Sequence, residues 1–271
     1  MNFKEKFKKI SKKNNSLLCV GLDIDRKKIP KYLFSKSRTP FFDFNKKIID
    51  STKDLVCAYK LNMAFYEALG MEGYKTLEKT IDYIPNDIVF ILDGKRNDIG
   101  NTAEKYALSI YKNLGADATT ISPYLGFDSI KPFLDYKDKC SFILCRTSNP
   151  SSKDFQDLKT KNKPLYVRVS EKIKEWNKEN DNCGVVVGAT YPEELREIRK
   201  ILGENIPFLI PGIGAQGGDI KKTVEYGTNK NGSSAIINSS RGIIYAGSGE
   251  MFYEKSREKA VSLRDEINKY R

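Results

Sequence analysis

Histidine is absent from this chain of 271 residues, and its absence excludes several kinds of active site. Without imidazole groups the protein cannot build a Ser/His/Asp or Cys/His triad, or a metal centre held by histidine. Any general acid–base chemistry must therefore come from Lys, Asp, Glu, Tyr or Cys side chains.

Long apolar runs are missing as well. No run in the sequence approaches the roughly 20 residues that a helix needs to cross a bilayer. The basic beginning, MNFKEKFKKI, is not followed by the continuous apolar stretch of a secretory signal. We therefore expect neither a membrane partner nor secretion. The 39% of hydrophobic residues still suffices for a full core, which excludes wholesale disorder.

Cysteine is scarce and odd in number, which argues against a disulfide framework. The five cysteines lie mostly inside apolar, strand-like runs, and they are Cys19, Cys57, Cys140, Cys145 and Cys183. We expect reduced thiols in the core of a cytoplasmic protein. Cys140 and Cys145 are too isolated to suggest a zinc site.

The net charge of +12 raises the question of a nucleic-acid partner. Lys and Arg are spread from end to end and are interleaved with acidic residues. No basic cluster with interleaved aromatic residues, as a nucleic-acid groove requires, stands out. We therefore expect no nucleic-acid partner and a solvated basic surface, whose field can attract a small anionic substrate. A basic RNA-binding protein is the alternative on charge alone.

Short, apolar, β-rich runs recur along the chain, each followed by a longer stretch with helical periodicity. The eight runs are Leu17–Asp23, Leu55–Asn62, Asp87–Lys95, Asp117–Tyr124, Ser141–Thr147, Cys183–Thr190, Ile206–Gly214 and Ala235–Gly242. Their near-continuous apolar character predicts parallel strands buried on both faces. Eight β/α units in 271 residues predict a single (β/α)₈ TIM barrel that spans residues 1–271 as one domain. An open doubly wound sheet is the alternative.

Several stretches between the runs have clear helix signals. Asn101–Gly115 places apolar residues on one stripe and ends in glycine. Pro192–Gly203 begins with proline and acidic residues and ends with basic residues and glycine. Helices are also expected over Asn2–Lys12 and Ser248–Arg271. The polar segment Asn149–Lys163 follows the fifth run, and we predict a loop there on the active face of the barrel.

Polar and charged residues stand where the apolar runs end, which is where barrel enzymes place their active sites. They are Asp23, Lys60, Asn62, Asp93, Lys95, Thr147, Ser148, Gln216 and Arg241. Because buried charges must be paired, we expect Asp23, Lys60, Asp93 and Lys95 to neutralise one another in alternation. A network of ion pairs that serves stability alone is the structural alternative.

The last two units have features of a phosphate site. PGIGAQGGD (Pro211–Asp219) follows the seventh run, and SSRGI (Ser239–Ile243) follows the eighth. Glycine-rich turns expose backbone N–H groups, and Arg241 can meet a phosphate dianion with charged hydrogen bonds. The loops after strands seven and eight are the frequent phosphate position in this fold. The polar, glycine-rich Gln216–Asp219 segment is the predicted lid.

The segment DGKRNDIGNTA (Asp93–Ala103) resembles the D-x-K-x-x-D-I-G-x-T signature of the orotidine 5′-phosphate decarboxylase family. Five further segments match in barrel order, namely GLD at 21–23, YKLN at 59–62, RTSNP at 146–150, PGIGAQGGD at 211–219 and SRG at 240–242. The chain is most similar to the longer, bacterial-type subgroup. The resemblance implies a cytosolic, cofactor-free homodimer. Its reaction would convert orotidine 5′-monophosphate to UMP and CO₂, the last step of de novo UMP synthesis.

The resemblance also implies roles for individual residues. Lys95 would donate a proton to C6 of the pyrimidine, and Asp93 would lie beside the substrate carboxylate. Lys60 and Asp23 would contact ribose hydroxyls and complete the charge array. Asp98 would reach into the active site of the neighbouring subunit.

The remaining implied contacts are with the base, the ribose and the phosphate. Ile99 would line the pyrimidine pocket, Thr102 would touch ribose, and Asn62 would lie near the ribose. Either Thr147 or Ser148 would meet the pyrimidine edge. The phosphate would be held in the segment that begins at Pro211, by Gln216, Arg241 and backbone amides near Gly214 and Gly242.

Two other enzyme classes compete with this interpretation. A Mg²⁺-dependent sugar-phosphate decarboxylase or aldolase shares the DxKxxD pattern on the same barrel, but Lys60 and Asn62 occupy a strand end where such enzymes place an acidic ligand. A Schiff-base aldolase could use Lys95 or Lys60.

Loss of CO₂ from C6 leaves a carbanion that the ring cannot delocalise. Because no motif for a metal or an organic electron sink is present, we expect fixed charges to stabilise it without any cofactor.

Overall fold

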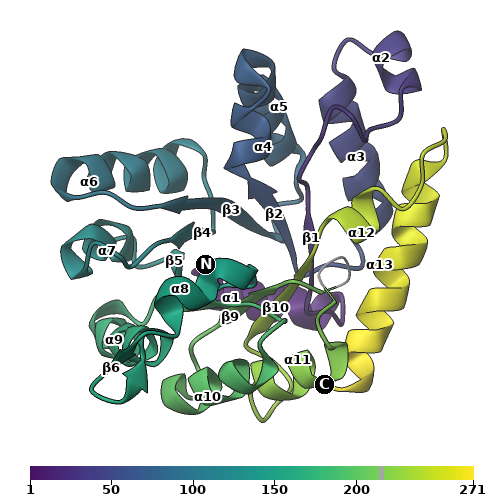
Figure 1. Ribbon diagram of the computed structural model, residues 1–271. Coiled ribbons are helices and arrows are strands. Elements are labelled where there is room, and N and C mark those ends of the chain that lie inside the picture. Colours follow the sequence, from purple (N-terminus) through teal and green to yellow (C-terminus); the bar gives the residue numbers. More distant parts are fainter. Residues whose placement is uncertain (214–216) are drawn as a thin grey trace.

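The computed structural model describes residues 1–213 and 217–271, and it contains a closed barrel of parallel strands surrounded by helices (Figure 1). The strand order around the barrel is β1-β10-β9-β8-β5-β4-β3-β2, and every neighbouring pair that carries a register is parallel. The predicted (β/α)₈ architecture is confirmed, and the open sheet is wrong because β1 pairs with both β2 and β10.

The barrel strands coincide with the eight apolar runs of the sequence. They are β1 Leu18–Gly21, β2 Ala58–Asn62, β3 Val89–Arg96, β4 Ala118–Ile121, β5 Cys140–Arg146, β8 Cys183–Val187, β9 Phe208–Pro211 and β10 Ala235–Ser239. Most strands are shorter than the runs at the carboxyl end. As a result Asp23 lies in the connection just beyond β1, and Arg241 begins a short helix just beyond β10, so neither belongs to the ladder.

Helices follow the strands and form the outer layer. They are α1 Phe3–Lys13, α2 Tyr32–Lys36, α3 Pro40–Thr52, α4 Met63–Glu67, α5 Gly70–Tyr83, α6 Gly100–Leu108, α7 Phe127–Leu134, α8 Lys153–Gln156, α9 Leu165–Asn180, α10 Pro192–Leu202, α11 Ile220–Gly227, α12 Arg241–Ile244 and α13 Phe252–Lys269. A π-helical turn, η1 Ser109–Asn113, extends α6, and a 3₁₀ turn, η2 Pro150–Ser152, precedes α8.

The helices predicted over Asn2–Lys12, Asn101–Gly115 and Pro192–Gly203 are confirmed, and capping residues stand at their ends. Asn2 caps α1 and forms a capping box with Glu5. The helix predicted over Asn101–Gly115 continues from α6 through η1, and Gly115 follows it with φ of +66°. α10 ends at Leu202, and the following residue, Gly203, has φ of +76°. Glycine adopts such left-handed backbone without steric cost, so it terminates both helices.

Two predictions about elements were wrong. The last helix begins at Phe252 rather than Ser248, because the preceding residues include Gly247 and Gly249, which disfavour helix. The segment Asn149–Lys163 is not only a loop. It contains η2, α8 and β6 (Lys159–Thr160), which pairs with β7 (Lys163–Pro164). Elements this short carry no readable periodicity.

Helix α1 covers the amino-terminal end of the barrel. Lys6 pairs with Asp117 at 2.6 Å, just before β4, and Lys13 pairs with Asp87 at 2.7 Å, just before β3. The Phe3 ring packs edge-on against Phe142 of β5, with 5.8 Å between ring centroids. With this end closed, the carboxyl ends of the strands form the accessible mouth of the barrel.

All five cysteines are free and buried, as the sequence predicts. Burial raises the pKa of the Cys57 thiol, and raises that of Cys183 to about 12. Among the helices in the described part of the chain, none combines the length and the apolar character needed to cross a membrane.

Candidate active site

A cavity of about 590 Å³ opens at the carboxyl ends of the strands, within the size range typical of small-molecule sites. Ten of the predicted site residues line it: Asp23, Lys60, Asn62, Asp93, Lys95, Thr147, Ser148, Pro211, Arg241 and Gly242. Two more, Gly214 and Gln216, lie outside the described residues, and Gln216 is also the first residue of the predicted lid.

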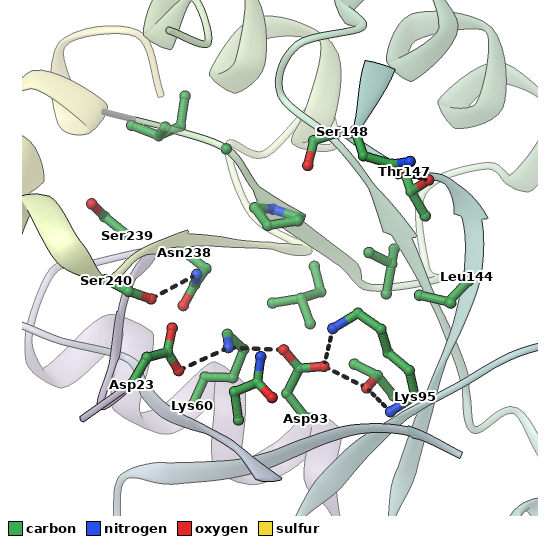
Figure 2. Close-up of a pocket in the computed structure, with 18 of the residues that line it drawn as sticks. Asp23, Lys60, Asp93, Lys95, Leu144, Thr147, Ser148, Asn238, Ser239 and Ser240 are labelled. Atoms are coloured by element: carbon green, nitrogen blue, oxygen red, sulfur yellow. Dashed lines mark hydrogen bonds and ion pairs between the residues drawn. The ribbon is translucent and has the colours of Figure 1, made fainter. Parts of the chain in front are cut away.

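Asp23, Lys60, Asp93 and Lys95 form a charged row along one side of the cavity (Figure 2). Lys60 Nζ lies 2.9 Å from Asp93 Oδ2 and 3.6 Å from Asp23 Oδ1, and Lys95 Nζ lies 2.7 Å from Asp93 Oδ1. The signs alternate as the sequence predicts, so each carboxylate has a cation beside it. Pairing of this kind is what makes charges tolerable inside a barrel.

The pKa values within the charged row reflect this pairing. Burial alone would raise the pKa of Asp93, but the ammonium groups of Lys60 and Lys95 lower it well below its usual value. Burial would lower the pKa of Lys60, yet Asp23 and Asp93 raise it above its usual value. Asp93 is therefore a carboxylate and Lys60 an ammonium ion throughout the physiological pH range.

Lys95 stands on an irregular part of β3. Its φ is +47°, a left-handed backbone that non-glycine residues rarely adopt. The β3–β4 pairing shifts register between Leu92 and Arg96, so Lys95 lies within a bulge. Its side chain is 48% exposed, whereas that of Asp93 is 8% exposed. The ammonium group of Lys95 thus faces the open space of the cavity, and its ion pair with the buried Asp93 carboxylate holds it there.

Beyond β5, Thr147 is held by Gln156 of α8. The Thr147 backbone N–H donates to Gln156 Oε1 at 2.9 Å, and Gln156 Nε2 donates to Thr147 Oγ1 at 2.9 Å. The Thr147 hydroxyl also donates to Asn149 Oδ1 at 2.7 Å. Its donor is therefore in use, whereas the Ser148 hydroxyl makes no hydrogen bond to the described residues and faces the cavity (Figure 2).

The side of the cavity formed by β9 and β10 is rich in small and polar groups. Gly212 has φ of +107°, and Arg241 and Gly242 begin α12 directly after β10. Asn238 of β10 is buried, and its Oδ1 has no hydrogen-bond partner among the described residues. The Oδ1 atom of Asp23 is likewise buried without a hydrogen bond. The Asp23 Oδ1 atom faces the Lys60 ammonium group at 3.6 Å.

Three predicted site residues lie away from the cavity. Asp98, Ile99 and Thr102 belong to the connection from β3 to α6 and its first turn, and none of them lines the cavity. The side chain of Ile99 is 58% exposed. The Asp98 carboxylate accepts a hydrogen bond from the Ile99 backbone N–H at 2.9 Å.

Sequence reasoning missed several residues that shape the cavity. Thr120 and Gln156 contact site residues directly, and Asn238 and Ser240 are polar groups that line the cavity. An apolar surface was also missed, made by Phe65, Leu144, Val186, Leu209 and Ile213. Thr120 and Asn238 sit inside apolar runs and Gln156 in a polar segment, so only their tertiary contacts distinguish them. Ser240 alone had a signal, as it stands beside Arg241.

No group of three or more acidic or thiol side chains in residues 1–213 and 217–271 is arranged to hold a metal ion. The Asn62 side-chain oxygen, at the end of β2, accepts from the Ala64 backbone N–H at 3.2 Å and caps α4. Lys60 and Lys95 add positive charge beside the cavity.

Comparison with known proteins identifies the relatives of the chain. The model of the orotidine 5′-phosphate decarboxylase / HUMPS family matches residues 16–255. The chain is 50% identical to orotidine 5′-phosphate decarboxylase of Dehalococcoides mccartyi, over 100% of this chain and 99% of the relative. It is 48% identical to that of Herpetosiphon aurantiacus, over 96% of each.

Solved structures agree with this match. Leishmania donovani UMP synthase has a TM-score of 0.88 and 41% identity, over 100% of this chain and 56% of that larger protein. Leishmania donovani OMP decarboxylase has a TM-score of 0.82 and 38% identity, over 98% of this chain and 100% of that chain.

Proposed function

The chain belongs to the orotidine 5′-phosphate decarboxylase / HUMPS family and decarboxylates orotidine 5′-monophosphate to UMP and CO₂ in pyrimidine biosynthesis, and we propose that fixed charges alone drive this reaction. The observation that carries the proposal is the charged row, in which Lys95 presents an ammonium group to the cavity beside the buried Asp93 carboxylate.

The order of groups around the barrel mouth fits the order of parts in a nucleotide. Arg241 and Gly242 follow β10, Asp23 and Lys60 come from β1 and β2, and Lys95 comes from β3. Phosphate, ribose and base can therefore lie across neighbouring strands. In this pose Arg241 and the Gly242 backbone hold the phosphate, with Pro211 beside them, and the family pattern adds Gln216 and Gly214 to this group.

The ribose then lies over β1 and β2. The Asp23 carboxylate lines the cavity and can accept from a ribose hydroxyl, and Lys60 beside it can donate to one. Asn62 uses its oxygen to cap α4, which leaves its N–H₂ group for the ribose. Between the two candidates for the pyrimidine edge, Ser148 is favoured, because the Thr147 hydroxyl already donates to Asn149.

The chemical step places Lys95 at C6 of the pyrimidine. As the bond from C6 to the carboxylate breaks, its electron pair stays on C6, and the Lys95 ammonium group opposes the growing negative charge. Lys95 then transfers a proton to C6, which yields UMP, and water restores the ammonium group. Asp93 remains ionised beside the departing carboxylate and holds Lys95 in place.

The charged row disfavours the competing enzyme classes. Lys60 and Lys95 repel a divalent cation, which weighs against a Mg²⁺-dependent aldolase. A Schiff base needs a neutral amine, but Asp23 and Asp93 raise the pKa of Lys60 above its usual value, which weighs against Lys60 in this role. The alternative in which Lys95 forms the Schiff base is tested by borohydride trapping.

The direct test uses EDTA-treated protein, orotidine 5′-monophosphate and a chromatographic assay for UMP. We expect full turnover, with no covalent adduct after borohydride is added to the reaction. Turnover that returns only with Mg²⁺, or a borohydride-trapped lysine adduct, would overturn the proposed mechanism.

We further propose a cytoplasmic homodimer in which residues 1–271 form one catalytic domain and the active sites are shared. Asp98, Ile99 and Thr102 lie away from their own cavity, which suits residues that complete a neighbouring site. The domain assignment is supported by α1 and α13, which pack on the same barrel from both ends of the chain. The five buried free thiols suit a reducing compartment.

Mixing two inactive variants tests the shared site. In a dimer of Lys95→Ala with Asp98→Ala, one of the two sites has both native residues, so we expect the mixture to regain activity after subunit exchange. The shared site would be refuted if the activity of the mixture equals the summed activities of the two separate variants, or if sedimentation analysis shows a monomer.

A further inference from the structure

The irregular stretch of β3 that carries the charged row faces a single residue of β4. Leu92 pairs with Thr119, and Arg96 pairs with Ile121. Three residues of β3, from Asp93 to Lys95, therefore stand opposite Thr120 alone. Because the bulge interrupts the ladder, backbone groups within it need other hydrogen-bond partners.

The Thr120 hydroxyl supplies such a partner. It accepts from the Lys95 backbone N–H at 3.0 Å and donates to Asp93 Oδ1 at 2.7 Å. The same Asp93 oxygen receives the Lys95 ammonium group at 2.7 Å. Thr120 is 1% exposed and the Asp93 side chain is 8% exposed, so water has little access to the bond between the Thr120 hydroxyl and Asp93.

These contacts link the unusual Lys95 backbone to its carboxylate partner. A non-glycine residue with φ of +47° persists only where its surroundings fix it, and the Thr120 hydroxyl holds the Lys95 N–H. Asp93 is fixed from both sides, with Thr120 and Lys95 on Oδ1 and Lys60 on Oδ2. One hydroxyl therefore orients both members of the Asp93–Lys95 pair.

We propose that Thr120 is a positioning residue for proton transfer, which it serves by holding Lys95 in the bulge with its ammonium group directed over Asp93. This inference rests on the proposed function, in which Lys95 protonates C6. The groups assigned to phosphate and the pyrimidine edge, Arg241 and Ser148, make no hydrogen bond to Thr120 among the described residues. Loss of the Thr120 hydroxyl should therefore affect the chemical step far more than substrate binding.

The neighbouring Thr119 provides a matched control. It is buried on the same strand, and its hydroxyl donates to the Leu92 backbone carbonyl at 2.7 Å instead of to the charged row. Thr120 lines the cavity and Thr119 does not, so the unchanged KM and UMP affinity of Thr120→Val are the readouts that separate positioning from direct substrate contact. Thr119→Val and Thr120→Val each remove one buried hydroxyl from β4 with little change of shape, but only the second touches the Asp93–Lys95 pair.

The experiment compares kcat, KM and UMP affinity for Thr120→Val, Thr120→Ser and Thr119→Val. Because hydrogen bonds to charged groups are among the stronger ones, we expect Thr120→Val to lower kcat by about 10- to 100-fold. Its KM and its affinity for UMP should stay within about threefold of the parent values. Thr120→Ser keeps the hydroxyl and should retain kcat, and Thr119→Val should leave kcat unchanged.

The positioning role of Thr120 and the proposed decarboxylase function fail through different outcomes. A kcat for Thr120→Val equal to that of Thr119→Val, or a Thr120→Ser variant as impaired as Thr120→Val, would overturn the positioning role. If Thr120→Val folds poorly, Thr120→Ala removes the hydroxyl without adding bulk and must give the same selective loss of kcat. Failure of the parent protein to convert orotidine 5′-monophosphate would instead overturn the proposed function itself.

Discussion

At the scale of single residues, the charged row explains how a barrel interior holds four ionic groups. Each cation in it contacts a carboxylate, and Asp93 contacts two cations. An ion pair of this kind is valuable mainly because either partner alone would be a buried, unpaired charge. The requirement for alternation made the row predictable, since the sequence places two acids and two amines at three consecutive strand ends.

Acid stability tests the state of Asp93. Its pKa lies below the ordinary value of 3.8, so its carboxylate stabilises the fold above about pH 3.8, and this contribution is lost as the pH falls toward the folded pKa. Asp93→Asn should lower the free energy of unfolding by about 3 kcal/mol at pH 7. Urea unfolding at several pH values should show the difference from the parent protein narrowing below pH 3.8. If the difference in the free energy of unfolding between Asp93→Asn and the parent protein does not change with pH, Asp93 is not an ionised, paired carboxylate in the folded protein.

At the scale of elements, the barrel strands and the capped helices could be predicted from the sequence. Parallel strands buried on both faces leave continuous apolar runs, and Gly115 and Gly203 mark helix ends through their positive φ. The short elements within Asn149–Lys163 could not be predicted, because their contacts with distant residues define them. Thr120 was missed for the same reason, as a threonine in a strand usually signals only β structure.

Helix α8, one of the short elements that could not be predicted, contacts the candidate site. Its Gln156 binds both the backbone N–H and the hydroxyl of Thr147, beside Ser148. Arg146 supports this arrangement: its guanidinium group lies 3.9 Å from the centre of the Tyr191 ring and 3.0 Å from Asp157. The connection beyond β5 is therefore set by side chains that the strand pattern does not reveal.

The base-specific role of this connection can be tested with two ligands. Gln156→Ala should weaken binding of UMP by about tenfold, because Ser148 loses its fixed position at the pyrimidine edge. Binding of ribose 5-phosphate, which has no base, should not change. Lys153→Ala, an exposed position on the same short helix, is the control. Equal weakening of both ligands in calorimetry would indicate a general structural defect.

At the scale of the whole molecule, the two ends of the barrel have separate tasks. Helix α1 closes the amino-terminal end through Lys6 and Lys13, whereas the carboxyl ends of the strands surround the cavity. Most of the predicted catalytic and substrate-binding residues at the strand ends line the cavity. The resemblance implies that Asp98 serves the neighbouring subunit, and Asp98 does not line the cavity of its own chain.

The net charge of +12 acts at this scale as well. A basic surface raises the local concentration of an anionic nucleotide, and Arg241 at the barrel mouth can hold its phosphate. In the proposed pose, binding and chemistry take place in different sectors of the mouth, with the phosphate beyond β10 and the reacting carbon above β3. Substitutions of Arg241 and Lys95 should therefore have different effects on the kinetics.

The most direct measurement is steady-state kinetics of UMP formation by Lys95→Ala and Arg241→Ala beside the parent enzyme. Lys95→Ala should lower kcat by about 10³-fold or more, because it removes both the proton donor and a charge that acts in the transition state. Arg241→Ala should mainly raise KM, by about 10- to 100-fold, because a charged hydrogen bond to the phosphate is lost. Small effects of similar size on kcat and KM in both variants would contradict the account.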